Sequence, residues 1–367
     1  MSAVQRHQHG GDLTLMAARY GRRPEDFLDF SVNVNPLGPP PGVAALLRDG
    51  LKYATVYPEP GCRSLKERYA PFFGVRPEQL IFTNGAVELI YLVFIALRPR
   101  TVLIPGPTFR EYELAARAWG GRLKMLRLEP VKGFIPGTEA LMRAARGAEL
   151  VFLCNPNNPA GSLIPPQVLE AFLEFCEEEG VFAVVDESFL LFHPRWRELT
   201  AGSAAAASRR LLVLQSLTKF FAIPGLRLGC GIAHPETISL LARFHPPWQV
   251  NGLAQAAALA ALQDEGYAFR SRHLVEEERS RLAAALSALP GIRVYSSEAS
   301  YLLIELASPL SAPFVAERLA QRGILVRDCS NFAFLDERFI RVAVKGRREN
   351  ELLVRELAGL LTGVFKT

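Results

Sequence analysis

The sequence predicts an α/β fold in which a mixed, mostly parallel seven-stranded sheet is covered by helices, next to a smaller α+β domain. Three observations support this prediction. Short apolar runs recur along residues 80–233, stretches of helical character separate them, and an Ala-, Glu- and Arg-rich pattern begins after residue 245. Apolar runs that alternate with helices are typical of strands buried on both faces of a sheet. The later change of pattern indicates the second, smaller domain.

Seven apolar runs are expected to form the large sheet. They span residues 80–83, 101–105, 122–128, 150–155, 181–186, 211–215 and 227–233. The clearest helix between them covers residues 167–179, because Pro165 and Pro166 suit a helix start, apolar residues follow at helical spacing, and Gly180 suits the end. This order of strands and helices predicts βαβ units.

The remaining elements divide the chain into three parts. A helical region over residues 253–289 is followed by strands at 293–296 and 301–305, a helix at 313–322, strands at 324–327 and 339–344, and a final helix. The first 40 residues contain no complete βαβ unit. We therefore expect an arm over residues 1–40 that packs on the small domain and a partner subunit, a large domain over 41–245, and a small domain over 246–367.

Composition excludes several classes of protein. Of the 367 residues, 49% are hydrophobic, which is ample for a buried core. The net charge of +5 contains no run of five basic residues, so a nucleic-acid partner is not expected. The five cysteines are odd in number and widely spaced, which predicts reduced core residues in the cytoplasm and neither disulfides nor metal ligands. The longest apolar stretch, residues 89–97, predicts no membrane anchor.

Lys219 has the sequence neighbours of a reactive amine. It follows the apolar run 211–214, and burial among apolar side chains lowers the pKa of a lysine, which makes it a nucleophile toward carbonyl groups. Ser216 and Arg227 lie on either side and could bind a phosphate. These three residues together predict a Schiff base with pyridoxal 5′-phosphate (PLP).

Residues that follow the other strands fit the same cofactor, because ligands of open α/β sheets bind outside the carboxyl ends of the strands. Gly85 and Ala86 open a helix whose N–H groups suit a phosphate. Phe109 offers a face for a flat ring, Asn158 an amide donor, and Asp186 a carboxylate for a ring nitrogen. Each residue alone is more simply a turn, cap or core residue, whereas their occurrence at consecutive strand ends favours the site.

The motifs resemble those of the class I/II aminotransferase family of fold-type I PLP enzymes. Asn-Pro-Ala-Gly at 158–161, Asp-Glu at 186–187 and Ser-x-x-Lys at 216–219, with Arg227 eight residues later, occur in the family's order along nearly the whole chain. The resemblance implies that Lys219 is the Schiff-base lysine, Asp186 the partner of the pyridine nitrogen and Asn158 the donor to the ring hydroxyl. It further implies that Gly85, Ala86, Ser216 and Arg227 hold the cofactor phosphate and that Phe109 stacks on the ring.

The same resemblance implies a shared site and a substrate. Tyr57 corresponds to the tyrosine that in relatives reaches the phosphate across the interface of a homodimer, and Arg341 to the arginine that binds a substrate carboxylate. Residues 9–11, 30–38 and 217–227 are most similar to the threonine-phosphate decarboxylases of cobalamin biosynthesis, with the histidinol-phosphate aminotransferases as the neighbouring branch. The chain departs from this pattern at two positions, since Asp12 stands where the decarboxylases have Asn and Ala160 stands in place of the usual Thr.

The expected reaction is decarboxylation of L-threonine O-3-phosphate to (R)-1-amino-2-propanol O-2-phosphate. Phe189 replaces a tyrosine found in many transaminases, which favours the decarboxylase branch. PLP labilises whichever bond of the α-carbon stands perpendicular to its ring, so anchoring decides the reaction. We expect His9, Asn33, Arg327 and Arg341 to grip the substrate's phosphate and carboxylate, and Lys219 to return a proton to the α-carbon.

Other interpretations stay open. An aminotransferase acting on histidinol phosphate or a similar compound would use the same residues, and a catalytically inactive PLP-fold binding module would keep only the fold. Serine phosphate differs from threonine phosphate by one methyl group, which a pocket distinguishes weakly. His9 could be an untethered terminal residue, and Arg327 with Asp328 an ordinary surface pair.

Overall fold

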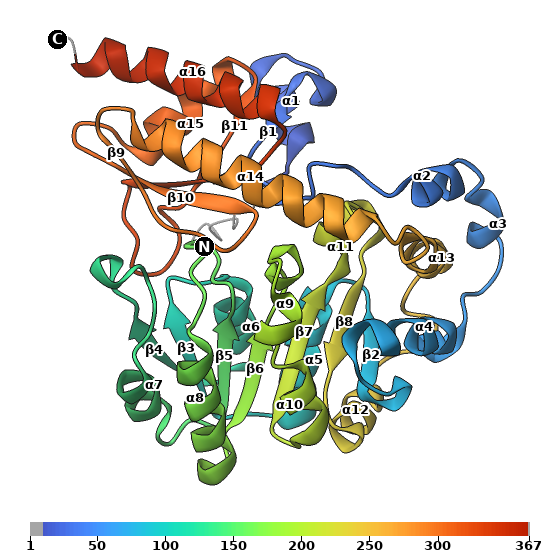
Figure 1. Ribbon diagram of the computed structural model, residues 1–367. Coiled ribbons are helices and arrows are strands. Elements are labelled where there is room, and N and C mark those ends of the chain that lie inside the picture. Colours follow the sequence, from blue (N-terminus) through green and yellow to red (C-terminus); the bar gives the residue numbers. More distant parts are fainter. Residues whose placement is uncertain (1–9, 366–367) are drawn as a thin grey trace, which may run out of the picture.

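The computed structural model describes residues 10–365, and its larger part is built on one seven-stranded sheet (Figure 1). The strands are β2 (Leu80–Thr83), β3 (Thr101–Gly106), β4 (Arg122–Arg127), β5 (Leu150–Cys154), β6 (Phe182–Asp186), β7 (Leu211–Ser216) and β8 (Gly229–Ile232). Their order in the sheet is β2-β8-β7-β6-β5-β3-β4, and β8 runs antiparallel to β2 and β7, whereas the pairs from β7 to β4 are parallel. All seven predicted strands are present, which confirms the mixed, mostly parallel sheet.

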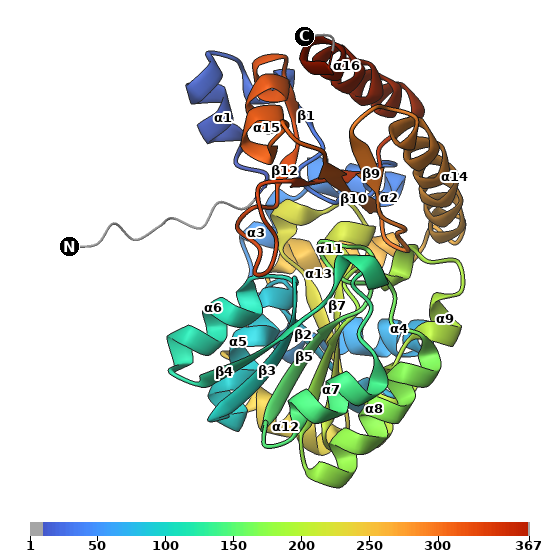
Figure 2. The same cartoon turned by 90° about the vertical axis from the view of Figure 1, so that its left-hand side faces the viewer.

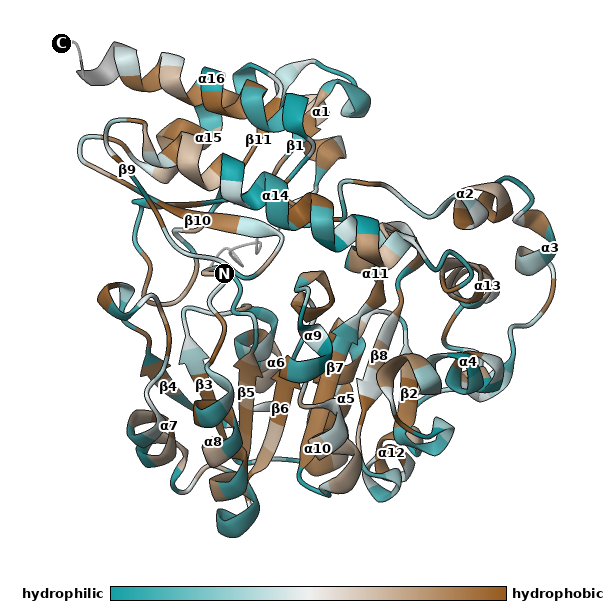
Figure 3. Ribbon diagram, viewed as in Figure 1, coloured by the Kyte–Doolittle hydropathy of each residue, from teal (hydrophilic) through white to brown (hydrophobic). Residues whose placement is uncertain are grey.

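Both faces of this sheet are covered, which explains the continuous apolar runs in the sequence. Neighbouring residues of β5 illustrate the alternation, because Val151 and Phe152 belong to separate buried clusters on opposite faces. One face packs against α4 (Arg63–Phe73), α7 (Thr138–Ala145), α8 (Pro166–Glu179), α10 (Gly202–Ala207) and α13 (Gly252–Ala261). The other packs against α5 (Ala86–Leu97), α6 (Glu111–Trp119) and α12 (Pro235–Ala242). Figure 2 shows helices on both sides of the sheet, and Figure 3 shows its strands to be mostly hydrophobic.

The smaller part contains a four-stranded antiparallel sheet in the order β12-β13-β10-β9. Its strands are β9 (Ile292–Val294), β10 (Tyr301–Leu306), β12 (Arg327–Asp328) and β13 (Phe339–Ala343). The helices α14 (Tyr267–Ser287), α15 (Ala312–Gln321) and α16 (Arg347–Phe365) share a buried cluster with this sheet. Figure 1 shows the smaller part stacked on the larger one, at the carboxyl ends of β5, β6 and β7.

Two expected elements are divided in the structure. The helical region expected over 253–289 is two helices, because the chain leaves α13 at Ala261 and α14 starts only at Tyr267, after Gly266. The strand expected over 324–327 is also two, since β11 (Ile324–Leu325) pairs in parallel with β1 (Leu28–Asp29), whereas β12 joins the four-stranded sheet. Along α14, Val275 belongs to the core of the large sheet and Leu282 to that of the small sheet. The domain boundary at residue 246 stays a prediction.

The arm packs on the smaller part. Besides the pairing of β1 with β11, Tyr20 in α1 (Leu13–Tyr20) donates a hydrogen bond of 2.8 Å to Glu317 of α15. Asp12 caps α1 by accepting a hydrogen bond of 3.0 Å from the Leu15 N–H, so this departure from the family pattern has a structural role. Contact of the arm with a partner subunit stays a prediction.

Two further observations concern the sequence predictions. All five cysteines are buried and unpaired, as predicted. None of the helices within residues 10–365 is long and apolar enough to cross a membrane.

Candidate active site

A cavity of about 530 Å³ lies between the two sheets, at the carboxyl ends of β5, β6 and β7. It brings together most of the residues that the sequence predicted. Those that line it are Asn33, Ala86, Phe109, Asn158, Asp186, Ser216, Lys219, Arg227, Arg327 and Arg341. The predicted substrate residue His9 lies outside the described residues, although Gly10 lines the cavity.

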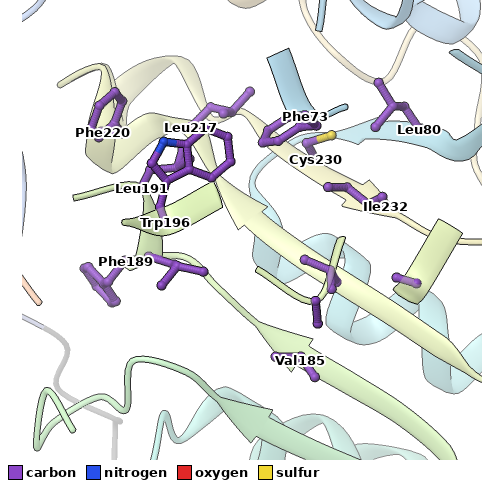
Figure 4. Close-up of a cluster of buried hydrophobic side chains, with 14 of the residues drawn as sticks. Phe73, Leu80, Val185, Phe189, Leu191, Trp196, Leu217, Phe220, Cys230 and Ile232 are labelled. Atoms are coloured by element: carbon purple, nitrogen blue, oxygen red, sulfur yellow. The ribbon is translucent and has the colours of Figure 1, made fainter. Parts of the chain in front are cut away.

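Lys219 is presented by the short helix α11 (Leu217–Phe220), directly after β7. The neighbouring side chains of Leu217 and Phe220 are buried in a cluster with Phe189 and Trp196 (Figure 4), so the helix is fixed from behind. The Lys219 Nζ donates a hydrogen bond of 3.1 Å to the Ser216 hydroxyl and lies 5.0 Å from the centre of the Phe189 ring. Burial lowers the pKa of the Lys219 ammonium, although the charge of Asp186 opposes this shift. A larger share of the amine is therefore neutral and nucleophilic.

The carbonyl end of α11 is held by the arm and by α14. The Asn35 N–H donates to the Lys219 carbonyl over 3.0 Å, and its side-chain amide donates to the Phe220 carbonyl over 2.8 Å. The same amide lies 2.8 Å from the Ser271 hydroxyl of α14. Asn35 is buried, so its backbone and side-chain N–H groups find their partners on the carbonyl groups of α11. The position of Lys219 thus depends on residues far from it in sequence.

Asp186 ends β6 with a carboxylate that is almost fully buried in the wall of the cavity. One oxygen, Oδ1, accepts a hydrogen bond of 2.9 Å from the Ser188 N–H. The other, Oδ2, accepts one of 2.6 Å from the Tyr112 hydroxyl. A carboxylate has more acceptor sites than these two, so Asp186 can still accept a hydrogen bond from a protonated ring nitrogen.

The start of α5 and the Arg227 side chain form a close-fitting cradle. Gly85 has a φ of +84°, and a Cβ atom added there would lie 2.5 Å from Arg227 Nη2. Gly229 is similarly restricted, because an added Cβ would lie 2.3 Å from the Ala86 backbone nitrogen. Gly85 itself does not line the cavity, whereas Ala86, Ser216 and Arg227 do. A helix N-terminus, a hydroxyl and a guanidinium brought together in this way fit a phosphate group.

Arg327 and Arg341 project from the small sheet into the same cavity, and both are buried. Arg341 donates to Asn158 Oδ1 and, over 2.9 Å, to the Ser31 carbonyl, and Arg327 donates over 2.7 Å to Asn331. Within residues 10–365 neither guanidinium forms an ion pair with a carboxylate, and burial lowers the pKa of both. Buried charges are normally paired, so this arrangement indicates an anionic ligand.

Two buried polar atoms at this end of the cavity lack partners among the described residues. They are Asn33 Oδ1 and Arg341 Nε. Buried polar groups are seldom left unsatisfied, and both residues line the cavity. These atoms therefore support a polar ligand beside the two arginines.

Tyr57, like Gly85, is a predicted cofactor residue that does not line the cavity. Its side chain is 80% exposed, and its ring is 4.8 Å from that of Trp248. The predicted contact across a dimer interface stays a prediction.

Sequence reasoning missed several residues of the cavity and its surroundings. Ser31, Arg110, Glu111, Cys154 and Phe332 line the cavity, and Tyr112 contacts Asp186 behind it. Cys154 is the last residue of β5, so the strand-end rule that found Asp186 also applied to it. Tyr112 gave no such signal, because it lies inside α6 among residues of ordinary helical character.

Comparison with known proteins decides the family. A family model described as aminotransferase class I and II matches residues 25–357. The chain belongs to this family. It is 35% identical to the threonine-phosphate decarboxylase of Salmonella typhimurium over 358 residues, covering 97% of each chain. It is 33% identical to the histidinol-phosphate aminotransferase of Moorella thermoacetica over 341 residues, covering 92% of this chain and 86% of that one.

Solved structures confirm the fold of this family member. The crystal structure of the histidinol-phosphate aminotransferase from Clostridium acetobutylicum superimposes with a TM-score of 0.85 and 29% identity, covering 92% of this chain and 99% of that one. The predicted fold-type I architecture is therefore confirmed, and family membership confirms PLP as the cofactor.

Proposed function

We propose that this family member decarboxylates L-threonine O-3-phosphate to (R)-1-amino-2-propanol O-2-phosphate. The observation that carries the proposal is the pair Arg327 and Arg341, two buried guanidinium groups that face the cavity of Lys219 without a carboxylate partner among residues 10–365. A substrate with a carboxylate and a phosphate supplies one anion for each cation. Similarity to a decarboxylase over 97% of the chain supports the same substrate.

The cavity residues fit PLP in the roles that the sequence predicted. Lys219 would bind the cofactor covalently, Asp186 would pair with its ring nitrogen, and Phe109 would meet the ring face. Asn158 would donate to the ring hydroxyl through its side-chain nitrogen, because Arg341 occupies its oxygen. The cradle of Gly85, Ala86, Ser216 and Arg227 would hold the phosphate. When bound, PLP supplies an electron sink for the pair left on the α-carbon as a bond to it breaks.

The protein's own contribution is to orient the substrate. Arg327, Arg341 and Asn33 would hold the carboxylate and phosphate and so decide which bond of the α-carbon is broken. Lys219, released when the substrate binds, would deliver a proton to the α-carbon from its Nζ. Phe189 presents a ring face to Lys219 where a tyrosine would present a hydroxyl, which supports decarboxylation.

Transamination is the second candidate. It is supported by the 33% identity to a histidinol-phosphate aminotransferase and by the close superposition with another. The same two arginines would then bind the phosphate of the donor and the carboxylate of the acceptor acid. A cytoplasmic location stays a prediction under either reaction.

Product analysis distinguishes the two reactions. The purified PLP-loaded protein is incubated with L-threonine O-3-phosphate labelled at the carboxyl carbon, and separately with histidinol phosphate and 2-oxoglutarate. The proposal predicts labelled carbon dioxide and the amine phosphate in the first reaction and no glutamate in the second. Glutamate without carbon dioxide would contradict it.

A matched pair of substrates tests the pocket further. Serine phosphate lacks one methyl group, so we expect kcat/KM to fall by about 10- to 200-fold. The kcat/KM for unphosphorylated threonine should be lower still, because this substrate leaves a buried guanidinium without an anion. Equal rates with threonine and threonine phosphate would contradict the proposed anion site.

A further inference from the structure

Tyr112 is a buried residue of α6 that the proposed mechanism does not yet use. It lies three residues after Phe109, near the start of α6, and is fully buried behind the cavity wall. Its hydroxyl donates the 2.6 Å hydrogen bond to Asp186 Oδ2, and its ring meets that of Phe109 edge-on at 5.6 Å between centroids. Tyr112 thus contacts two residues that would touch the cofactor ring.

The position of the Tyr112 hydroxyl is fixed by the core. Its ring is stacked on Phe152 of β5, with centroids 4.8 Å apart and planes inclined by 9°. Phe152 is in turn stacked on Phe94 of α5. A side chain packed in this way has little rotational freedom, so the direction of its hydroxyl group is set before any ligand binds.

The Tyr112 hydroxyl is also a permanent donor. Burial and the nearby charge of Asp186 raise the pKa of the phenol well above its ordinary value, so the group stays protonated across the working pH range. A hydrogen bond from a neutral hydroxyl to a carboxylate is short and strong. Together with the Ser188 N–H on Oδ1, it holds Asp186 by both oxygens.

We propose that Tyr112 is a positioning residue that acts through Asp186, holding this carboxylate in the orientation that meets the protonated ring nitrogen of PLP. The inference rests on the proposed role of Asp186. Part of the protein's affinity for the cofactor ring then depends on Tyr112, a residue that does not line the cavity.

Tyr69 shows what a purely structural tyrosine looks like in this protein. It is equally buried, and its hydroxyl donates over 3.1 Å to the backbone carbonyl of Ala258, within the core on the other face of the sheet. Removing either hydroxyl leaves a buried acceptor with one partner fewer, but only Tyr112 is bonded to a cavity residue. Tyr69→Phe is therefore the matched control for Tyr112→Phe.

The test measures the affinity of the apo protein for PLP by absorbance titration. Tyr112→Phe keeps the stacked ring and should weaken PLP binding by about ten-fold, since hydrogen bonds to charged groups are strong ones. Tyr69→Phe should leave the affinity unchanged. In an Asp186→Asn background, Tyr112→Phe should change PLP affinity by less than about two-fold, because a residue that acts through Asp186 has nothing left to position.

Three outcomes would overturn the inference. The first is unchanged PLP affinity in Tyr112→Phe, and the second is an equal loss of PLP affinity in both backgrounds. The third is a Tyr112→Phe variant that fails to fold while Tyr69→Phe folds, because the hydroxyl would then be structural. Failure of the proposed function looks different. In that case the unaltered protein would bind PLP through Lys219 and fail to release carbon dioxide, or would not bind PLP at all.

Discussion

At the scale of single residues, the chemistry of Lys219 depends on the groups that surround its amine. No carboxylate contacts the Nζ directly within the described chain, and its hydrogen bond goes to the Ser216 hydroxyl. The cation of Arg227 and that of Arg341 act in the same direction as burial, which lowers the pKa of Lys219. The cluster behind α11 therefore stabilises the helix and also sets the reactivity of the lysine.

This environment predicts the pH dependence of covalent PLP uptake. Only the neutral amine attacks a carbonyl, so the rate should rise with pH and reach half its maximum below the ordinary pKa of lysine. The measurement is stopped-flow absorbance of the apo protein mixed with PLP over a range of pH. A half-maximum at or above the value of a free lysine would contradict the effect of burial.

Glu187 predicts a pH dependence of stability. It is fully buried beside Asp186, and burial raises its pKa from 4.5 to about 8, although Thr200, the Ala201 N–H and Gln215 donate to its carboxylate. The folded state therefore holds a proton that the unfolded state has lost between these two values, and stability should fall as pH rises through this window.

The comparison is urea unfolding of the unaltered protein and of Glu187→Gln at several pH values. The free energy of unfolding of the unaltered protein should fall relative to the variant as pH rises toward about 8. A difference that is constant with pH would show that Glu187 is charged in the folded protein and would contradict the prediction.

At the scale of elements, the strands of the large sheet and the polar residues at their carboxyl ends were predictable from the sequence. Lys219, Asp186 and Asn158 come directly after apolar runs, and parallel strands bring such residues to one edge of the sheet. The division of residues 324–327 between two sheets was not predictable, because it depends on pairing with β1, about 300 residues earlier. Tyr112 and the contacts of Asn35 with α11 likewise depend on distant packing.

The cradle before α5 gives a prediction with an internal control. Gly85→Ala places a Cβ against Arg227 at a φ of +84°, whereas Gly74→Ala creates a similar strain at a φ of +70° with nothing within 4 Å. Both substitutions should cost about 1 kcal/mol of stability from backbone strain. Only Gly85→Ala should also weaken PLP binding, by about ten-fold or more, since it displaces a phosphate ligand. Equal PLP affinities of the two variants would contradict the cradle.

At the scale of the whole molecule, the cavity depends on three parts of the chain. The larger part of the fold supplies Lys219 and Asp186, the small sheet supplies Arg327 and Arg341, and the arm supplies Asn33. Arg341 joins all three, since it lies on β13 and donates to Asn158 and to the Ser31 carbonyl. A change in the packing of one part should therefore alter the geometry of the others.

A homodimer with shared active sites, proposed from the family resemblance, predicts complementation between inactive variants. Tyr57 is highly exposed, with its ring tilted against that of Trp248, as expected of a residue that serves a partner's site. When Lys219→Ala and Tyr57→Ala chains are refolded together, mixed dimers contain one site with both intact residues, which should restore activity to about a quarter of all sites. The measurement is decarboxylase activity of the mixture, and activity no higher than the sum of the parents would contradict sharing.

The most direct test of the proposed site is to find the amine that carries the cofactor. The protein is loaded with PLP, reduced with borohydride, digested, and its peptides are mapped by mass spectrometry. We expect a single pyridoxyl adduct, on Lys219, and none in Lys219→Ala. An adduct on any other lysine would contradict the assignment of Lys219.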